Sequence, residues 1–234
     1  MRYLFLALFI LSCKGNRVSN NLEYYVINIE GAMLYRKAEF DSRIIDTISN
    51  TSEVHIIEIV ETNQKVEIGK NFEFEGPFMK VNYNEIIGYI HNSDLSAIKP
   101  KIIQSQKGLI QLSLFGEVLN KKEIQTTKII GSEEFLVDEI ITEYENAIYT
   151  YSSFDGCFDH KYQTRNLKKH EVYHHMVNEY VFYGHSIDGF FIWVPEFQKK
   201  DDNKLYFQGE GDTEDLIIKI IDEKSFVISS YDCT

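Results

Sequence analysis

The chain has 234 residues, with 24 basic and 36 acidic side chains and a formal net charge of −12 at pH 7. A nucleic-acid-binding surface needs clustered lysine and arginine, so this composition excludes nucleic acid as an expected partner. The length is enough for one large domain or for two small domains that each bury a core.

The first thirteen residues have the pattern of a secretory leader. Arg2 is followed by an unbroken apolar run over residues 3–11, and Ser12 and Cys13 come next. The run is shorter than the roughly 20 residues that span a bilayer, and its layout is typical of a signal peptide. Ile10-Leu11-Ser12-Cys13 resembles the lipobox of bacterial lipoproteins, which implies cleavage before Cys13 and a lipid on its thiol.

We therefore expect a signal peptide over residues 1–12, lipidation at Cys13 and a polar tether over residues 13–22. The expected location is the cell envelope, with membrane attachment through the lipid, because an acidic protein has no basic patch to hold it at an anionic surface. An ordinary cleaved signal with an incidental cysteine is the alternative.

Strand signals begin near residue 23 and continue to residue 98. Short runs of β-branched and aromatic residues alternate with polar turns over residues 24–28, 33–35, 44–48, 54–60, 78–82 and 86–90. This pattern without helical periodicity predicts a small all-β barrel over residues 23–98, with a long loop over residues 63–77.

This region resembles the bacterial SH3-like domain family. The matching segments cover about a third of the chain and are Met33-Leu-Tyr-Arg36, residues 42–48, residues 54–60, Phe78-Met-Lys-Val81 and Gly88-Tyr-Ile-His-Asn-Ser-Asp-Leu95. The resemblance implies a non-enzymatic binding module of the cell envelope that is directed at peptidoglycan or at an envelope protein.

Six side chains are candidates for a binding groove on this barrel: Tyr35, Arg36, Phe40, Phe78, Tyr89 and His91. Aromatic rings at barrel loops can provide broad stacking faces that carry a polar group. Phe78 and Tyr89 also alternate with polar neighbours as core residues do, so we expect both to be buried. His91 is expected at the surface.

After Lys99-Pro-Lys101 a second series of strand signals predicts an antiparallel β-sandwich or barrel over residues 101–234. The signals lie at residues 109–115, 128–130, 135–141, 147–151, 179–186, 190–194, 205–207, 216–221 and 225–230. Asp188-Gly189 is a strong hairpin-turn signal. A closed barrel here would allow a lipocalin-like carrier of small ligands, which is one alternative function.

Two cysteines remain once Cys13 is assigned to a lipid. In an exported protein this even remainder predicts a disulfide between Cys157 and Cys233, with two buried free thiols as the alternative. Such a bond would tie the carboxy-terminal strand to a loop, where the chain end would otherwise fray.

One motif has the spacing of a catalytic zinc site. In His170-Glu171-Val-Tyr-His174 the two imidazoles would share one face of a helix, and the glutamate would activate a metal-bound water. The segment is barely long enough for a helix, and no third ligand is evident, although His185 and Glu196 are available. We expect a polar surface or loop here, with no catalytic residue, metal or cofactor; a zinc hydrolase using Glu171 as base is the alternative.

Overall fold

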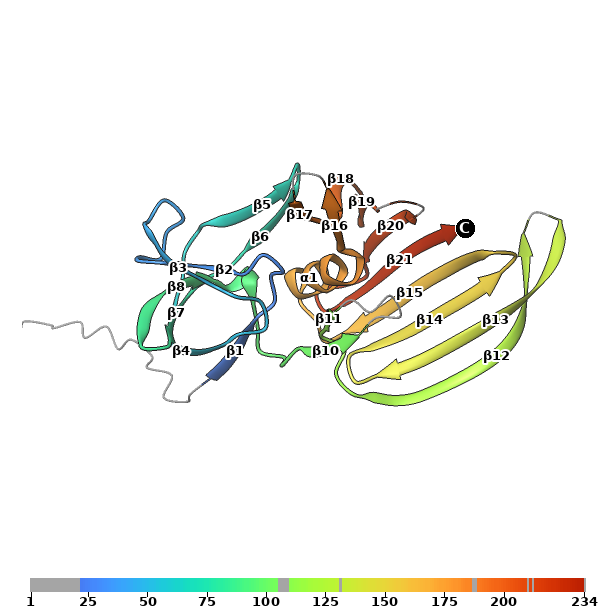
Figure 1. Ribbon diagram of the computed structural model, residues 1–234, viewed down its shortest axis with the longest axis horizontal. Coiled ribbons are helices and arrows are strands. Elements are labelled where there is room, and N and C mark those ends of the chain that lie inside the picture. The colour runs from blue at the N-terminus through green and yellow to red at the C-terminus, as the bar shows by residue number, and fades with distance from the viewer. Residues whose placement is uncertain are drawn as a thin grey trace, which may run out of the picture.

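The structure is a computed structural model that describes residues 22–104, 110–130, 132–186, 189–209, 211 and 213–233. The expected signal peptide, Cys13 and all but the last residue of the tether lie outside the described residues. Within these ranges strands dominate (Figure 1), together with one α-helix and one short 3-10 helix, which confirms the all-β class. No helix among the described residues is long and apolar enough to cross a membrane.

The first part of the chain forms a seven-stranded antiparallel sheet in the order β3-β2-β8-β7-β4-β1-β9. Its strands are β1 (Leu22–Val26), β2 (Ala32–Tyr35), β3 (Ile44–Ile48), β4 (Glu53–Val60), β7 (Phe78–Tyr83), β8 (Ile86–His91) and β9 (Leu95–Ser96), and a 3-10 turn over Asn92–Asp94 joins the last two. Every strand contributes to one buried cluster, so the sheet wraps around a core of its own. The cluster consists of Val26, Ala32, Leu34, Ile48, Val54, Ile56, Met79, Val81, Ile90 and Leu95.

The stretch that was expected to be a long loop contains a hairpin, β5 (Lys65–Gly69) and β6 (Phe72–Glu75). Phe72 and Phe74 on β6 are 2% and 3% exposed, and neither belongs to the core of the wrapped sheet. They pack instead against the helix, where the ring of Phe74 lies 5.3 Å from that of Tyr173. The hairpin therefore reaches out of the first part of the chain and contacts the second.

The second part of the chain contains an eight-stranded antiparallel sheet in the order β12-β13-β14-β15-β21-β20-β19-β18. Its strands are β12 (Val118–Ile130), β13 (Glu133–Tyr144), β14 (Ala147–Phe154), β15 (Cys157–Arg165), β18 (Glu196–Asp201), β19 (Lys204–Gln208), β20 (Thr213–Ile220) and β21 (Ser225–Cys233). Strands β12 and β18 are its two edges, so the described strands form an open sheet, whereas we expected a sandwich or barrel. Strands β12 and β13 extend away from the rest of the molecule (Figure 1).

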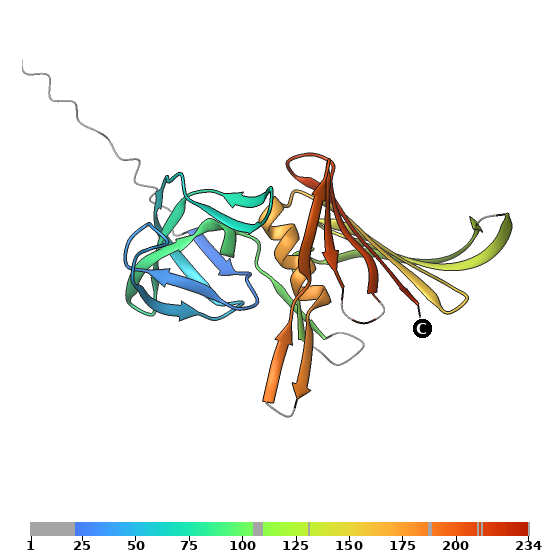
Figure 2. The ribbon, with the colours of Figure 1, turned by 90° about the horizontal axis from the view of Figure 1, so that it is seen from above.

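Two short hairpins and the helix complete the second part: β10 (Lys101–Gln104) with β11 (Ile110–Ser113), β16 (Phe182–Ser186) with β17 (Gly189–Trp193), and α1 (Lys169–Tyr180). Pairing of β16 with β17 agrees with the expected hairpin, although Asp188 of its turn lies outside the described residues. Figure 2 shows α1 between the wrapped sheet and the eight-stranded sheet.

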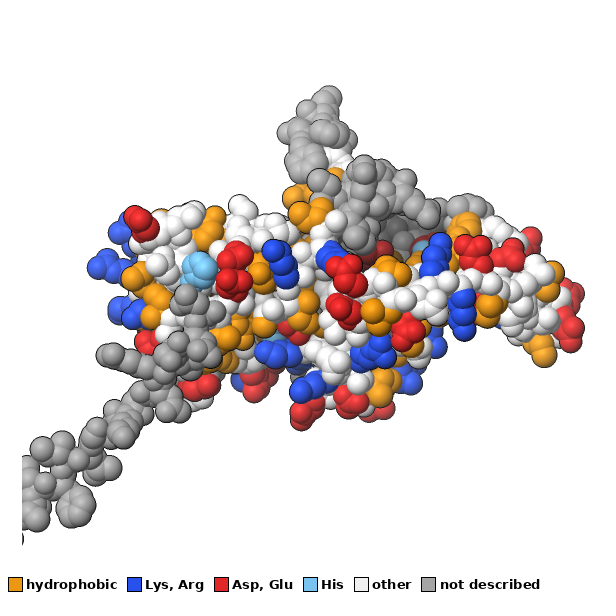
Figure 3. Space-filling model, turned by 90° about the horizontal axis from the view of Figure 1, so that it is seen from below, with side chains coloured by type: hydrophobic (Ala, Val, Ile, Leu, Met, Phe, Trp, Pro, Cys, Tyr) orange, Lys and Arg blue, Asp and Glu red, His pale blue; other side chains and the backbone are white. Residues whose placement is uncertain are grey.

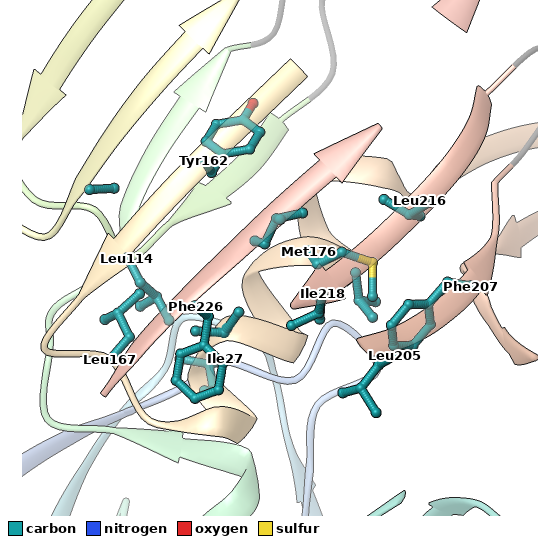
Figure 4. Close-up of a cluster of buried hydrophobic side chains, with 14 of the residues drawn as sticks. Ile27, Leu114, Tyr162, Leu167, Met176, Leu205, Phe207, Leu216, Ile218 and Phe226 are labelled. Carbon is teal, nitrogen blue, oxygen red and sulfur yellow. The ribbon is translucent and has the colours of Figure 1, made fainter. Parts of the chain in front are cut away.

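The largest core is shared by the two parts of the chain (Figure 4). It includes Ile27, Phe72 and Phe74 from the first part. From the second part it takes side chains of α1, of the sheet and of the connections beside them, among them Leu114, Tyr162, Leu167, Val172, Met176, Val177, Leu205, Phe207, Leu216, Ile218, Phe226 and Ile228. The boundary that we expected near residue 100 is thus crossed by continuous apolar packing.

The expected disulfide between Cys157 and Cys233 is present, with an S–S distance of 2.07 Å. Cys157 begins β15 and Cys233 ends β21, and the two residues face each other across the paired strands. The bond closes a loop with a sequence separation of 76 residues. On the chain-entropy account, a loop of this length stabilises the fold by roughly 4 kcal/mol.

Charges of both signs are spread over the surface. On the face shown in Figure 3, acidic and basic side chains are interspersed with apolar ones along the length of the molecule. The acidic excess therefore does not mark a single site on this face.

Candidate functional site

Four of the six side chains proposed for the groove form one aromatic cluster, and Phe40 lies at its centre. The Phe40 ring is 5.9 Å from that of Tyr35, 5.0 Å from that of Phe78 and 5.2 Å from that of His91. Phe40 lies in the turn between β2 and β3, while the other three rings come from β2, β7 and β8. The wrapped sheet thus brings together aromatic residues that are up to 56 positions apart in the sequence.

The depth of these side chains differs from residue to residue. Phe78 is fully buried, as expected, and Tyr35 is 8% exposed. His91 is only 1% exposed, which corrects its expected surface position, because its ring contacts Ser93 Oγ at 2.8 Å and the Gly76 carbonyl oxygen at 3.1 Å. Burial lowers the pKa of His91, so this imidazole is a neutral, hydrogen-bonded part of the interior. Arg36 is exposed, and Tyr89 is half-buried, which corrects its expected burial. Neither belongs to the aromatic cluster.

A pocket of about 310 Å³ opens beside Tyr35 and Phe40. Its apolar wall is completed by Met33 and Val66, and its polar residues come from turns and strand ends. These are Asn28, Glu30, Thr47, Lys65 and Asp94, and Gly31 completes the lining. We did not select the polar residues from the sequence, because a lone acid or amide in a turn has no motif that separates it from a solvated one. We name this site the barrel pocket.

Asp94 is an acidic group of the barrel pocket whose pKa is strongly shifted. Burial raises the pKa of its carboxyl to about 6, and a hydrogen bond that Asn28 Nδ2 donates to Asp94 Oδ1 over 3.0 Å partly opposes this shift. The same carboxyl contributes, after burial, to raising the pKa of Tyr35. A partly desolvated carboxylate beside aromatic rings is an environment that favours a positively charged or hydrogen-bond-donating ligand.

A tight turn positions Asn28. Its side-chain oxygen accepts a hydrogen bond from the Glu30 amide at 3.1 Å, and its carbonyl oxygen accepts one from the Gly31 amide at 2.9 Å. Gly31 has a φ of +88°, and a Cβ at this position would lie 2.7 Å from the Ile48 carbonyl oxygen. Glycine is therefore required here, and the turn it permits places Asn28 against Asp94.

The balance of charge in the barrel pocket is acidic. Glu30 and Asp94 are carboxylates, and the one basic group of the lining, Lys65, forms ion pairs with Glu73 and Glu75 at 2.5 Å each. Because Lys65 already has carboxylate partners, it does not offset Asp94. The chemistry of the pocket therefore suits an amino group held between a carboxylate and aromatic rings.

The HExxH pattern lies on α1 and is buried, which corrects the expected surface or loop. His170, Glu171 and His174 are 7%, 4% and 5% exposed. His170 Nε2 lies 3.2 Å from the Leu95 carbonyl oxygen. Glu171 Oε1 accepts a hydrogen bond from Ser96 Oγ at 2.6 Å, and Oε2 accepts one from the Lys168 amide at 2.7 Å. The glutamate thus caps the start of α1 and fastens it to β9.

Three imidazoles of α1 are held in the neutral form by burial, with a pKa lowered to about 3 for His170, about 4 for His174 and about 3 for His175. No hydrogen-bond partner exists among the described residues for either ring nitrogen of His175, whose ring contacts that of Phe115 at 3.8 Å. The one described group of three side chains whose ligand atoms lie within 4.8 Å of one another is Glu23, Glu53 and His55, at the surface. Glu196 is exposed, and the side chain of His185 lies outside the described residues.

Comparison of the chain with family models, with curated proteins and with solved structures finds no match. The candidate sites therefore rest on the residues and contacts of this chain alone.

Proposed function

We propose that the protein is a non-enzymatic lipoprotein of the cell envelope, held by a lipid on Cys13, and that its SH3-like barrel binds peptidoglycan through the barrel pocket. The observation that carries this proposal is the pocket of about 310 Å³ in which Tyr35 and Phe40 stand beside the desolvated carboxyl of Asp94. An envelope protein is the alternative ligand.

The topology of the first part of the chain supports an SH3-like barrel. Seven strands wrap around one core, and a 3-10 turn over Asn92–Asp94 leads into the last short strand. Asp94 ends that turn and faces the barrel pocket. The segment over residues 88–95, which is one of the matching segments in the sequence, thus contains the end of β8, the 3-10 turn and one acidic group of the site.

The pocket chemistry supports a ligand that presents an amine. Peptide stems of peptidoglycan carry free amino groups next to short aliphatic side chains, and this combination fits a carboxylate flanked by aromatic and apolar walls. A protein partner would have to present a lysine or a free amino terminus in the same way.

The experiment is co-sedimentation of the full mature chain, with Cys13→Ser to omit the lipid, with insoluble peptidoglycan. We expect wild-type binding and a loss of at least several-fold in Asp94→Asn, which removes the charge but keeps the shape. Asp202→Asn removes one exposed negative charge from the turn between β18 and β19 and is the matched control. Wild-type retention no greater than that of an unrelated acidic protein, or equal retention by Asp94→Asn, contradicts the proposal.

The zinc-hydrolase alternative has one observation in its favour, because His170 and His174 do lie on a helix. The hydrogen bonds of Glu171 to Ser96 and to the Lys168 amide instead support a structural role, since a general base needs a free carboxylate oxygen. Metal analysis of the purified full chain separates the two. Stoichiometric zinc that is lost in His170→Ala would favour the hydrolase over the binding module.

The lipocalin-like alternative depends on a closed barrel in the second part of the chain. The described strands there form an open sheet with edges β12 and β18, and α1 packs into its core. This arrangement supports a filled interior, so we do not propose a carrier.

A further inference from the structure

A second concentration of aromatic and polar side chains lies on the eight-stranded sheet, on the face that α1 contacts. Across β14 and β15, Tyr149 is opposite Tyr162 and Tyr151 is opposite His160. Across β15 and β21, His160 is opposite Ser230 and Phe158 is opposite Asp232. Because successive side chains of a strand point to opposite faces, this register places all of them on one face of the sheet.

His160 links Tyr149 to Asp232. The Tyr149 hydroxyl is hydrogen-bonded to His160 Nδ1 at 2.8 Å, and His160 Nε2 lies 3.3 Å from Asp232 Oδ2, within ion-pair distance. Both ring nitrogens of His160 therefore face a polar partner. The side chains of His160 and Asp232 are still 24% and 28% exposed, so a ligand can reach them.

The rings divide into an inner and an outer group. The inner rings, Tyr149 and Tyr162, are stacked with centroids 4.4 Å apart and an interplanar angle of 13°, and both join the large core. In the outer group, Tyr151 is stacked with Phe158 at 5.9 Å and 15°, and it lies 5.3 Å from His160. Neither Tyr151 nor Phe158 belongs to the core cluster, so their faces are not needed to fill the interior.

The last turn of α1 fixes the inner end of this array. The Tyr162 hydroxyl donates to Glu179 Oε1 at 3.0 Å, and the Tyr180 hydroxyl lies 2.8 Å from Ser230 Oγ. Burial raises the pKa of Glu179. The array is thus attached to the helix and core on one side and partly exposed on the other, which is the arrangement of a pre-organised binding surface.

The chemistry of the array selects among possible ligands. The electron-rich face of an aromatic ring attracts the weakly positive C–H face of a sugar, and a carboxylate beside it can accept a hydrogen bond from a hydroxyl. A phosphate-bearing ligand such as a nucleotide would also stack, but the carboxylate of Asp232 would repel it. A quaternary ammonium needs rings on several sides, whereas these rings lie along one sheet face.

We propose that the Tyr151, Phe158, His160 and Asp232 face is a binding site for a neutral carbohydrate, with a sugar ring on the Tyr151 and Phe158 rings and its hydroxyls on His160 and Asp232. The site lies on the second part of the chain and shares no residue with the barrel pocket. It does not depend on the function proposed for that pocket.

Isothermal titration of the full mature chain with chitotetraose and with maltotetraose tests the proposal. We expect binding of at least one of these neutral oligosaccharides. Tyr151→Ala, which removes an aromatic ring under the sugar, and Asp232→Asn, which removes the charge of the hydrogen-bond acceptor, should each weaken this binding at least tenfold. Tyr231→Ala is the matched control, because Tyr231 is next to Asp232 on β21 but points to the opposite face. Each variant is first compared with the wild type by thermal unfolding, and the folded ones are titrated.

Binding of neither oligosaccharide at millimolar concentration overturns the proposal, as does unchanged affinity in both site variants. An affinity for glucose 6-phosphate equal to that for the neutral oligosaccharides also overturns it, because the carboxylate of Asp232 should disfavour an anion. The Asp94→Asn variant is expected to keep oligosaccharide binding while losing retention on peptidoglycan. The two proposals can therefore fail independently.

Discussion

His174 Nε2 on α1 lies 3.8 Å from Asp94 Oδ1, the acidic group of the barrel pocket. The helix of the second part of the chain therefore stands directly behind the candidate site of the first. Asn178 on the same helix strengthens this contact, since its Nδ2 donates to the Ile27 carbonyl oxygen at 3.1 Å and its Oδ1 accepts from Asn50 Nδ2 at 3.2 Å. The shape of the barrel pocket thus depends on the docking of α1.

Phe72→Ala should destabilise the whole protein. Phe72 is 2% exposed and packs against Tyr173, Phe197 and Phe207 of the second part. Removing a buried phenylalanine ring costs about 3–5 kcal/mol, since burial is lost and a cavity remains. Urea unfolding followed by circular dichroism measures the change. Phe182→Ala, at a ring that is 38% exposed, should cost much less; equal costs would show that the shared core does not carry stability.

Acid should destabilise the protein through the histidines of α1. In the folded state the pKa values of His170, His174 and His175 are about 3, 4 and 3, below the unfolded value of 6.5. The unfolded chain therefore binds more protons between about pH 6.5 and pH 3, and stability falls as the pH falls through this window. Two buried acids act in the opposite direction and favour folding as the pH falls. The pKa of Asp94 is raised from 3.8 to about 6, and the pKa of Glu179 is also raised. The three histidines, together with His91, outweigh them.

Unfolding free energies at pH 7, 6, 5 and 4 measure this slope. His175→Leu replaces a buried imidazole that has no hydrogen-bond partner among the described residues, so it should flatten the slope and leave stability at pH 7 unchanged or increased. His55→Asn, at an exposed histidine, is the control substitution. If His175→Leu does not alter the slope, the buried histidines of α1 are not the cause of the loss of stability in acid.

Glu171→Ala should destabilise the protein by roughly 1–3 kcal/mol, because the Ser96 hydroxyl and the Lys168 amide lose their acceptor in a buried place. A double-mutant cycle with Ser96→Ala isolates the pair, since the effects of contacting residues are not additive. A coupling energy near zero would show that the 2.6 Å contact between Ser96 and Glu171 does not hold α1 to β9.

Loss of the disulfide should lower the thermal midpoint without changing the fold. Replacing Cys157 and Cys233 by serine together is expected to cost roughly 4 kcal/mol, because a loop with a separation of 76 residues is no longer closed in the unfolded chain. Differential scanning calorimetry of the variant under non-reducing conditions gives the shift. Treatment of the wild type with a reductant should reproduce it, and no shift in either experiment would argue against the bond.

The strands of the first part were largely visible in the sequence, because short runs of β-branched and aromatic residues are a strong local signal. The hairpin of β5 and β6 was not predicted, although Phe72-Glu-Phe-Glu75 alternates apolar and polar residues. It lies in the long stretch between two segments that match the SH3-like family, and that stretch was expected to be a loop. A polar surface or loop was expected in place of helix α1 for a related reason. Its histidines look polar in the sequence, and only the surrounding sheet, hairpin and turn make them part of the interior.

The barrel pocket was predictable only in its aromatic half. Tyr35 and Phe40 line the pocket and were among the six candidates, because large rings near strand ends are informative by type alone. Phe78 and His91 belong to the aromatic cluster beside the pocket and do not line it. Asn28 and Asp94 are 66 positions apart and meet through their hydrogen bond, so no spacing in the sequence indicates the pair. The same holds for Tyr149, His160 and Asp232, which the register of three strands brings together.

Strand β21 is the last element of the chain, yet it lies between β15 and β20 in the interior of the eight-stranded sheet. Its Phe226 and Ile228 enter the same core as Ile27, close to the other end of the described chain. This core therefore cannot close before β21 has paired with β15 and β20. Folding is cooperative between segments that are far apart in the sequence, and the first part of the described chain does not complete its share of this core without β21.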